Sequence, residues 1–106
     1  MVNYDYLIED ARRRQDVFRN LDRYLRIIKE VVKSIDPNAE VYLFGSVAEN
    51  RYALSSDIDV LVITNVDPGI ILERLWKAGI EPPFEIHVRT PDKLTYYERF
   101  SKLIKV

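Results

Sequence analysis

The sequence contains no cysteine, which excludes disulfides, thiol nucleophiles and cysteine-ligated metals. It also contains no apolar run that approaches the roughly 18 residues of a membrane-spanning helix. Residues 1–5 lack a cationic segment followed by an apolar run, so we expect no secretory signal. These absences favour a soluble, cytoplasmic protein that does not enter a membrane.

An excess of positive charge is lacking as well. The 16 Lys and Arg residues are matched by 17 Asp and Glu residues, for a formal net charge of −1. No overall positive field therefore holds a long polyanion, which argues against a nucleic-acid coat protein. Apolar residues make up 47% and charged residues 31% of the 106 residues, enough for a core under a solvated surface. We expect residues 1–106 to form a single domain.

The first 36 residues have the pattern of a long helix. Apolar side chains recur at steps of three and four, the spacing of one helical face: Phe18, Leu21, Leu25, Ile28, Val32 and Ile35. The basic run 12–14 lies between Asp10 and Asp16, which predicts a solvated face. The helix is expected to stop at Asp36, because the residue before a proline is pushed out of the α region.

The length of this segment bears on how it packs. A continuous helix from residue 3 to residue 36 would span about 50 Å, whereas a globule of this size is roughly 34 Å across. The helix therefore either breaks, with the polar stretch Arg12–Asp16 as the candidate position, or overhangs the core. An overhang carrying Tyr4, Leu7, Ile8 and Ala11 would need a partner, or a second copy of the chain, to cover it.

After residue 37 the pattern changes to short strands that alternate with helices. The strands are expected at 41–44, 57–64 and 84–89, and the helices at 68–78 and from 91 onward. This order predicts an α/β (α+β) fold, a small mixed sheet of three or more strands covered by helices. The domain is thus divided into an N-terminal helical segment (1–36), a strand core (40–90) and a C-terminal helix (91–106).

Two carboxylates open the second predicted strand. Because side chains alternate in a strand, Asp57 and Asp59 share one face and lie roughly 7 Å apart. Burial and mutual repulsion both raise the cost of two ionised carboxylates, and a divalent cation removes both penalties. Oxygen ligands suit Mg²⁺ or Mn²⁺. The alternative for an isolated Asp-x-Asp is a pair that caps a turn or remains in water.

A Gly-Ser pair ends the first predicted strand. A glycine at this point lets the backbone turn sharply and lets a ligand approach closely. If Gly45 and Ser46 begin a helical turn, its N–H groups and the serine hydroxyl form an anion site. Gly-Ser by itself is only a turn in most proteins. Together with the two aspartates, however, it suits a nucleoside triphosphate carried with Mg²⁺.

The spacing of these motifs resembles a known family. Gly45-Ser46, ten intervening residues and Asp57-x-Asp59, flanked by strands, resemble the signature of the DNA polymerase β-type nucleotidyltransferases, and the short chain resembles their minimal members. The resemblance covers residues from about 25 to 98. It implies a polymerase-like palm and transfer of a nucleoside monophosphate from a triphosphate. Many minimal members are antitoxins of a helical HEPN-type partner, and some add AMP from ATP to a tyrosine of that partner.

The resemblance also implies a third carboxylate on a neighbouring strand, and Glu85 is the candidate. Many relatives have aspartate at this position. The extra methylene of Glu85 moves the carboxylate by about 1 Å or more, enough to alter a two-metal geometry. His87, the single histidine, lies two residues further on the same face. It is either a ligand or base, or a hydrogen-bonded sheet residue. Arg51, between the motifs, is a candidate contact for triphosphate oxygens.

The expected activity is Mg²⁺-dependent nucleotidyl transfer in which Asp57, Asp59 and Glu85 hold the metal. Gly45 and Ser46 would position the phosphates. Two alternatives remain open: a module that neutralises a helical partner by binding alone, and a subunit that nucleotidylates RNA or a small molecule. The residues do not distinguish the nucleobase.

Overall fold

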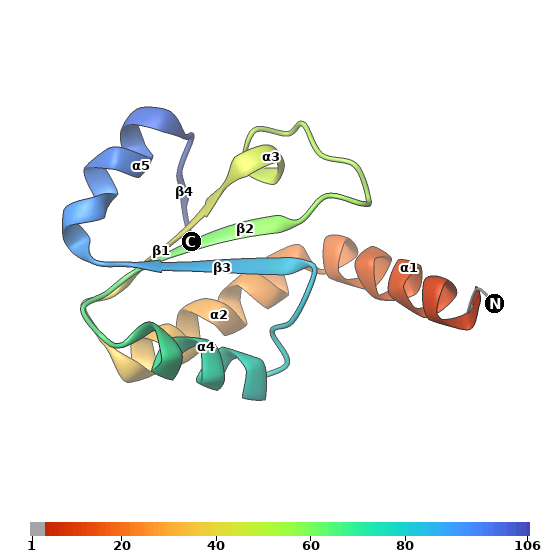
Figure 1. Cartoon of the computed structure of the whole chain (residues 1–106), viewed down its shortest axis with the longest axis horizontal. Helices are drawn as coiled ribbons and strands as arrows, with labels where there is room; N and C mark the ends of the chain where they lie inside the picture. Colours follow the sequence, from red (N-terminus) through yellow and green to blue (C-terminus); the bar gives the residue numbers. More distant parts are fainter. Residues whose placement is uncertain (1–3) are drawn as a thin grey trace.

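The computed structural model describes residues 4–106. A four-stranded mixed sheet with helices on both faces confirms the predicted α+β fold (Figure 1). Within residues 4–106 we find no helix whose length and apolar character would let it cross a bilayer. In chain order the elements are α1 (Tyr4–Arg19), α2 (Leu21–Ile35), β1 (Glu40–Phe44), α3 (Gly45–Ala48), β2 (Ile58–Ile63), α4 (Pro68–Lys77), β3 (Phe84–Arg89), the 3₁₀ turn η1 (Pro91–Lys93), α5 (Leu94–Phe100) and β4 (Ile104–Lys105).

The strand order β3-β2-β1-β4 places β2 inside the sheet. β1 is antiparallel to both β2 and β4, whereas β2 and β3 are parallel and are joined through α4. Five of the six residues of β2 are buried, which explains its nearly continuous run of β-branched side chains. The register pairs Asp59 with Phe44 on one side and with Glu85 on the other. The first residues of β2 and β3 therefore meet at one end of the sheet.

The two faces of the sheet are covered differently. α2 and α4 lie on one face and α5 lies on the other (Figure 1). Side chains of β2 alternate accordingly, so Val60 points to the α2 and α4 side and Leu61 to the α5 side, and both are 0% exposed. The main core is formed by the first face, where the sheet packs on the apolar side of α2, including Ile28 and Val32. Asp59 and Glu85 lie on the α5 side with Leu61.

The long N-terminal helix both breaks and overhangs. The break is at Asn20 and not within Arg12–Asp16, where it was predicted. The Asn20 side chain donates to the backbone oxygen and the carboxylate of Asp16, both at 3.0 Å, which stabilises the interruption. α1 then projects beyond the sheet (Figure 1), and the longest extent of the molecule is 46 Å. Tyr4 and Leu7 remain 69% and 53% exposed, as predicted for the overhang.

The C-terminal segment differs from the prediction of one helix over 91–106. α5 ends at Phe100, and Ser101 is extended with φ −144° and ψ 151°. The chain then returns to the sheet as β4, and the Val106 N–H donates to the Val41 carbonyl at 2.9 Å. The open edge of β1 explains the error, because its unpaired backbone groups bind a strand whatever the local helical preference.

Candidate functional site

The two aspartates of the motif lie at the end of β2 where the chain enters the sheet. Asp59 is the second residue of the strand and its side chain is 24% exposed, between β1 and β3. Asp57 precedes the strand and its side chain is 57% exposed. The two carboxylates therefore differ in environment, with Asp59 inserted into the fold and Asp57 at its surface.

Gly45 allows the Asp59 side chain to be partly buried between the strands, because it has no side chain of its own. It has φ +77°, and a Cβ added to it would lie 2.4 Å from Asp59 Oδ2. Only glycine gives both the left-handed backbone and the space for this carboxylate. Ser46 follows in α3 and is half-buried. In this structure Gly45 leaves the space that the Asp59 side chain occupies, while its contact with a phosphate stays a prediction.

Three metal-ligating side chains converge beside Gly45. One ligand atom each from Asp59, Glu85 and His87 lie within 4.8 Å of one another. His87 Nε2 is 3.3 Å from Asp59 Oδ1 and 3.6 Å from Glu85 Oε1. Two carboxylates and an imidazole fit a divalent cation, because hard oxygens and a borderline nitrogen are both metal ligands. The predicted pair Asp59 and Glu85 is brought together here, with His87 in place of Asp57.

Aromatic side chains pack against the imidazole ring of His87. The Phe44 ring meets His87 edge-on with centroids 5.0 Å apart and meets Tyr97 of α5 at 5.5 Å. His87 is 23% exposed, so the ring is packed but its Nε2 edge faces the carboxylates. This packing fixes the orientation of the His87 ring, so that its Nε2 atom has a defined position in the cluster.

Asp57 is engaged by an arginine from α1. Arg14 Nη2 lies 4.0 Å from Asp57 Oδ1, and Arg14 Nη1 donates to the carbonyls of Ser56 at 3.1 Å and Leu54 at 3.5 Å. Arg14 Nε also pairs with Asp10 at 3.1 Å. At 20% exposure it does not belong to the solvated face that the sequence predicted for residues 12–14. Only the i,i+4 pair with Asp10 is visible in the sequence, and the contact with a loop 40 residues away is not.

We expect Arg14→Ala to lower the free energy of unfolding by about 1–2 kcal/mol, because it removes hydrogen bonds from a charged donor to the loop carbonyls. Residues 50–57 should also be cleaved faster in limited proteolysis. Urea unfolding and mass spectrometry of the fragments measure both effects. Arg12→Ala, an exposed position on the same helix, is the control, and equal results for the two variants would contradict the role of Arg14.

Arg51, the predicted phosphate contact, lies in the exposed loop after α3. Its guanidinium pairs with Glu49 at 3.0 Å, and its side chain is 66% exposed. The same loop is attached to α1 through Tyr52, whose ring stacks on Phe18 at 5.1 Å. The structure therefore accounts for how the loop is held, while a contact between Arg51 and a triphosphate stays a prediction.

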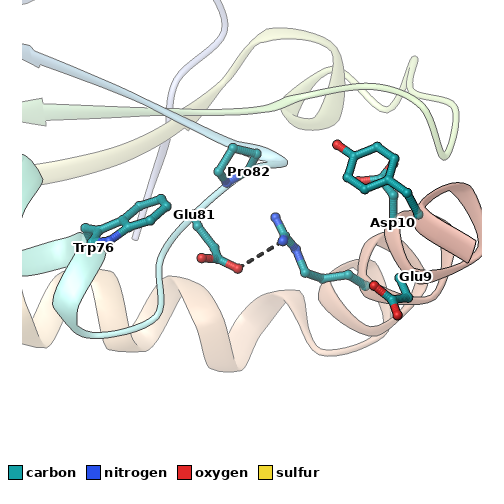
Figure 2. A pocket seen from close by; sticks show the side chains of 7 residues that line it. Glu9, Asp10, Trp76, Glu81 and Pro82 are labelled. Carbon is teal, nitrogen blue, oxygen red and sulfur yellow. Dashed lines mark ion pairs between the residues drawn. The ribbon is translucent and has the colours of Figure 1, made fainter. Parts of the chain in front are cut away.

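A separate cavity of about 350 Å³ lies between α1, α4 and the segment that leads into β3. An ion pair of 2.9 Å between Arg13 and Glu81 crosses it (Figure 2). Its lining residues are Tyr6, Glu9, Asp10, Arg13, Trp76, Glu81 and Pro82. None of them belongs to the Asp59 cluster, and three of the four charged groups are carboxylates, which would repel a triphosphate. This cavity is therefore less suited to a triphosphate than the end of the sheet.

Carboxylates, an imidazole and a glycine turn at the end of a mixed sheet define a site suited to a divalent cation and phosphate groups. Residues 25–105 match the family model described as a nucleotidyltransferase domain. The chain therefore belongs to the nucleotidyltransferase domain family.

Two crystal structures named as putative nucleotidyltransferases are similar to this chain. One is 34% identical with a TM-score of 0.61, over 74% of this chain and 92% of its own. The other, from Sulfolobus solfataricus, is 26% identical with a TM-score of 0.58, over 91% of this chain and 85% of its own. No curated protein matches the sequence significantly. These likenesses support the fold and the transferase class.

Proposed function

We propose that this protein transfers a nucleoside monophosphate, AMP from ATP, to a hydroxyl group with Mg²⁺ or Mn²⁺ as cofactor. The observation that carries the proposal is the position of Asp59, whose side chain lies against Gly45 and beside Glu85 within a nucleotidyltransferase domain. Asp57, Asp59 and Glu85 are the residues that would hold the cation. When bound, a divalent cation neutralises triphosphate oxygens and lowers the pKa of an acceptor hydroxyl.

The residues of the chain have separable tasks in this proposal. Gly45 lies against Asp59, and Gly45 and Ser46 would bind phosphate through backbone and hydroxyl donors. Asp57 would rotate toward Asp59, and little opposes this rotation, because the Asp57 carboxylate is 57% exposed and its contact with Arg14 is 4.0 Å long. Glu85 would accept the proton of the acceptor hydroxyl or complete the metal shell.

The acceptor in our proposal is a tyrosine hydroxyl of a helical, HEPN-type partner protein, and the transfer makes this protein an antitoxin. The family resemblance suggests this partner, and two structural features support a protein acceptor. The overhanging α1 leaves Tyr4, Leu7 and Ile8 at least half exposed, which is a surface for another chain. α1 is also tied to the Asp57 loop through Arg14, so a protein on α1 would lie next to the site.

Transfer is tested with ATP labelled at the α-phosphate, Mg²⁺ and the protein encoded by the neighbouring gene. We expect label on that partner and none when ATP is labelled at the γ-phosphate, because pyrophosphate leaves with the β and γ groups. The other three nucleoside triphosphates, labelled in the same way, measure the base preference. Asp57→Asn should remove the transfer, while Asp22→Asn, an exposed carboxylate at the start of α2, should not.

The same experiment distinguishes the two other functions. A stable complex without label, unchanged by Asp57→Asn, would support a partner-binding module without catalysis. The glutamate at position 85, where many relatives have aspartate, is the feature that favours this alternative. Label on RNA or on a small molecule, with none on the partner, would assign a different acceptor and contradict the antitoxin proposal.

A further inference from the structure

His87 reaches the cluster through the register of the parallel strands β2 and β3. Asp59 pairs with Glu85 and Leu61 with His87, so Asp59, Glu85 and His87 point to the same face of the sheet. The rotamer of His87 is held by the Phe44 ring, with centroids 5.0 Å apart. The result is one nitrogen, Nε2, aimed at two carboxylates that come from different strands.

His87 Nε2 and Asp59 Oδ1 are within reach of a long hydrogen bond at 3.3 Å, and the spacing of the three groups also leaves room for a shared ion. At 3.3 Å and 3.6 Å from the carboxylate oxygens, Nε2 is beyond the ordinary length of a charge-assisted hydrogen bond. A neutral imidazole also offers a single proton at Nε2, which cannot serve both carboxylates fully. Adjacent ligands of an octahedral cation with bonds near 2.1 Å are about 3 Å apart, close to the spacing seen here.

We propose that His87 Nε2 is a protein ligand of the metal beside Asp59 and Glu85, and that this site therefore prefers Mn²⁺ to Mg²⁺. The inference rests on the proposed function only in placing a divalent cation at Asp59. Imidazole nitrogen suits first-row transition metals, whereas Mg²⁺ retains oxygen ligands and water. A site of oxygens alone discriminates less between the two ions, so the histidine would increase the preference for Mn²⁺.

The test uses Mn²⁺ alone, without nucleotide or acceptor. Pulsed electron paramagnetic resonance of Mn²⁺ bound to the wild-type protein should show modulation from a directly coordinated ¹⁴N nucleus. His87→Gln should abolish this signal and weaken Mn²⁺ binding about 10-fold or more, while the affinity for Mg²⁺, measured by competition, changes less than about threefold. Glutamine keeps a hydrogen-bonding group near Nε2, so it separates ligation from hydrogen bonding.

Arg89→Gln is the matched control, because Arg89 lies on the same face of β3 two residues further along. It should leave both Mn²⁺ binding and the nitrogen signal unchanged. Wild-type Mn²⁺ binding without nitrogen modulation, or no Mn²⁺ binding at millimolar concentration, would overturn the proposal. The wild-type spectrum decides the question even if His87→Gln does not fold. Nucleotidyl transfer is measured separately, by the label-transfer experiment. Transfer without nitrogen ligation would contradict only the role of His87, whereas ligation without transfer would contradict only the proposed function.

Discussion

Replacing Asp59 with asparagine is expected to reduce nucleotidyl transfer about 10³-fold or more. Asparagine keeps the shape of the side chain against Gly45 but removes the charge that would hold a cation between β2 and β3. Metal stabilisation of transition-state charge is worth several kcal/mol, and each 1.36 kcal/mol corresponds to about a tenfold change in rate. The measurement is kcat/KM for label transfer at several Mg²⁺ and Mn²⁺ concentrations.

The fold of Asp59→Asn should be retained. The substitution weakens the contact with His87 by removing the negative charge but also relieves the repulsion with Glu85, and the two effects oppose each other in the free energy of unfolding. Thermal unfolding therefore serves as the control for structure, and Asp22→Asn serves as the control for loss of one negative charge. If Asp59→Asn kept more than about one tenth of the transfer, the carboxylate would not be the metal-holding group that we propose.

Replacing Gly45 with alanine is expected to affect both stability and transfer. The new Cβ would lie 2.4 Å from Asp59 Oδ2, and φ +77° strains any L-residue with a side chain. The left-handed backbone alone costs about 1–2 kcal/mol, and displacement of the carboxylate adds to this cost. Because Asp59 has to move, transfer should fall along with the free energy of unfolding, which urea titration measures.

Gly79→Ala provides the matched comparison for this variant. Gly79 also has a left-handed backbone, with φ +89°, but an added Cβ would meet nothing within 4 Å. It therefore carries the backbone strain without the steric conflict, and its transfer activity should be normal. In an Asp59→Ala background the conflicts with Oδ2 and Cγ disappear and only the 3.3 Å contact with Cβ remains, so Gly45→Ala should cost less stability there than in the wild-type protein. A Gly45→Ala protein as active as Gly79→Ala would contradict the proposed contact.

Much of the site could be predicted from residue order. Alternation in β2 places Asp59 on the face opposite the main core, and alternation in β3 places Glu85 and His87 on one face. Nothing local indicates that β3 pairs with β2 in the register that joins Asp59 to Glu85. That register depends on the crossover through α4 and on the burial of Val60 between the sheet and the helices.

Sequence patterns do not predict the contacts between segments that are far apart in the chain. Arg14 looked like one of three solvated arginines, because a helical pattern does not show that the loop before β2 folds back onto α1. The sequence predicts a helix where β4 lies, since the pairing of β4 with β1 is a property of the open sheet edge and not of residues 104–105.

The sequence by itself determined the periodicities and the chemistry of this protein: the amphipathic helices, the buried strand β2, and a glycine and carboxylates in a specific order. These follow from local sterics and from solvation, which act on neighbouring residues. Only the tertiary structure decided which carboxylates meet, that His87 joins them, and that Arg14 holds the loop of Asp57. The reason is that strand register, edge pairing and helix docking minimise the free energy of the whole chain, so no single segment contains that information.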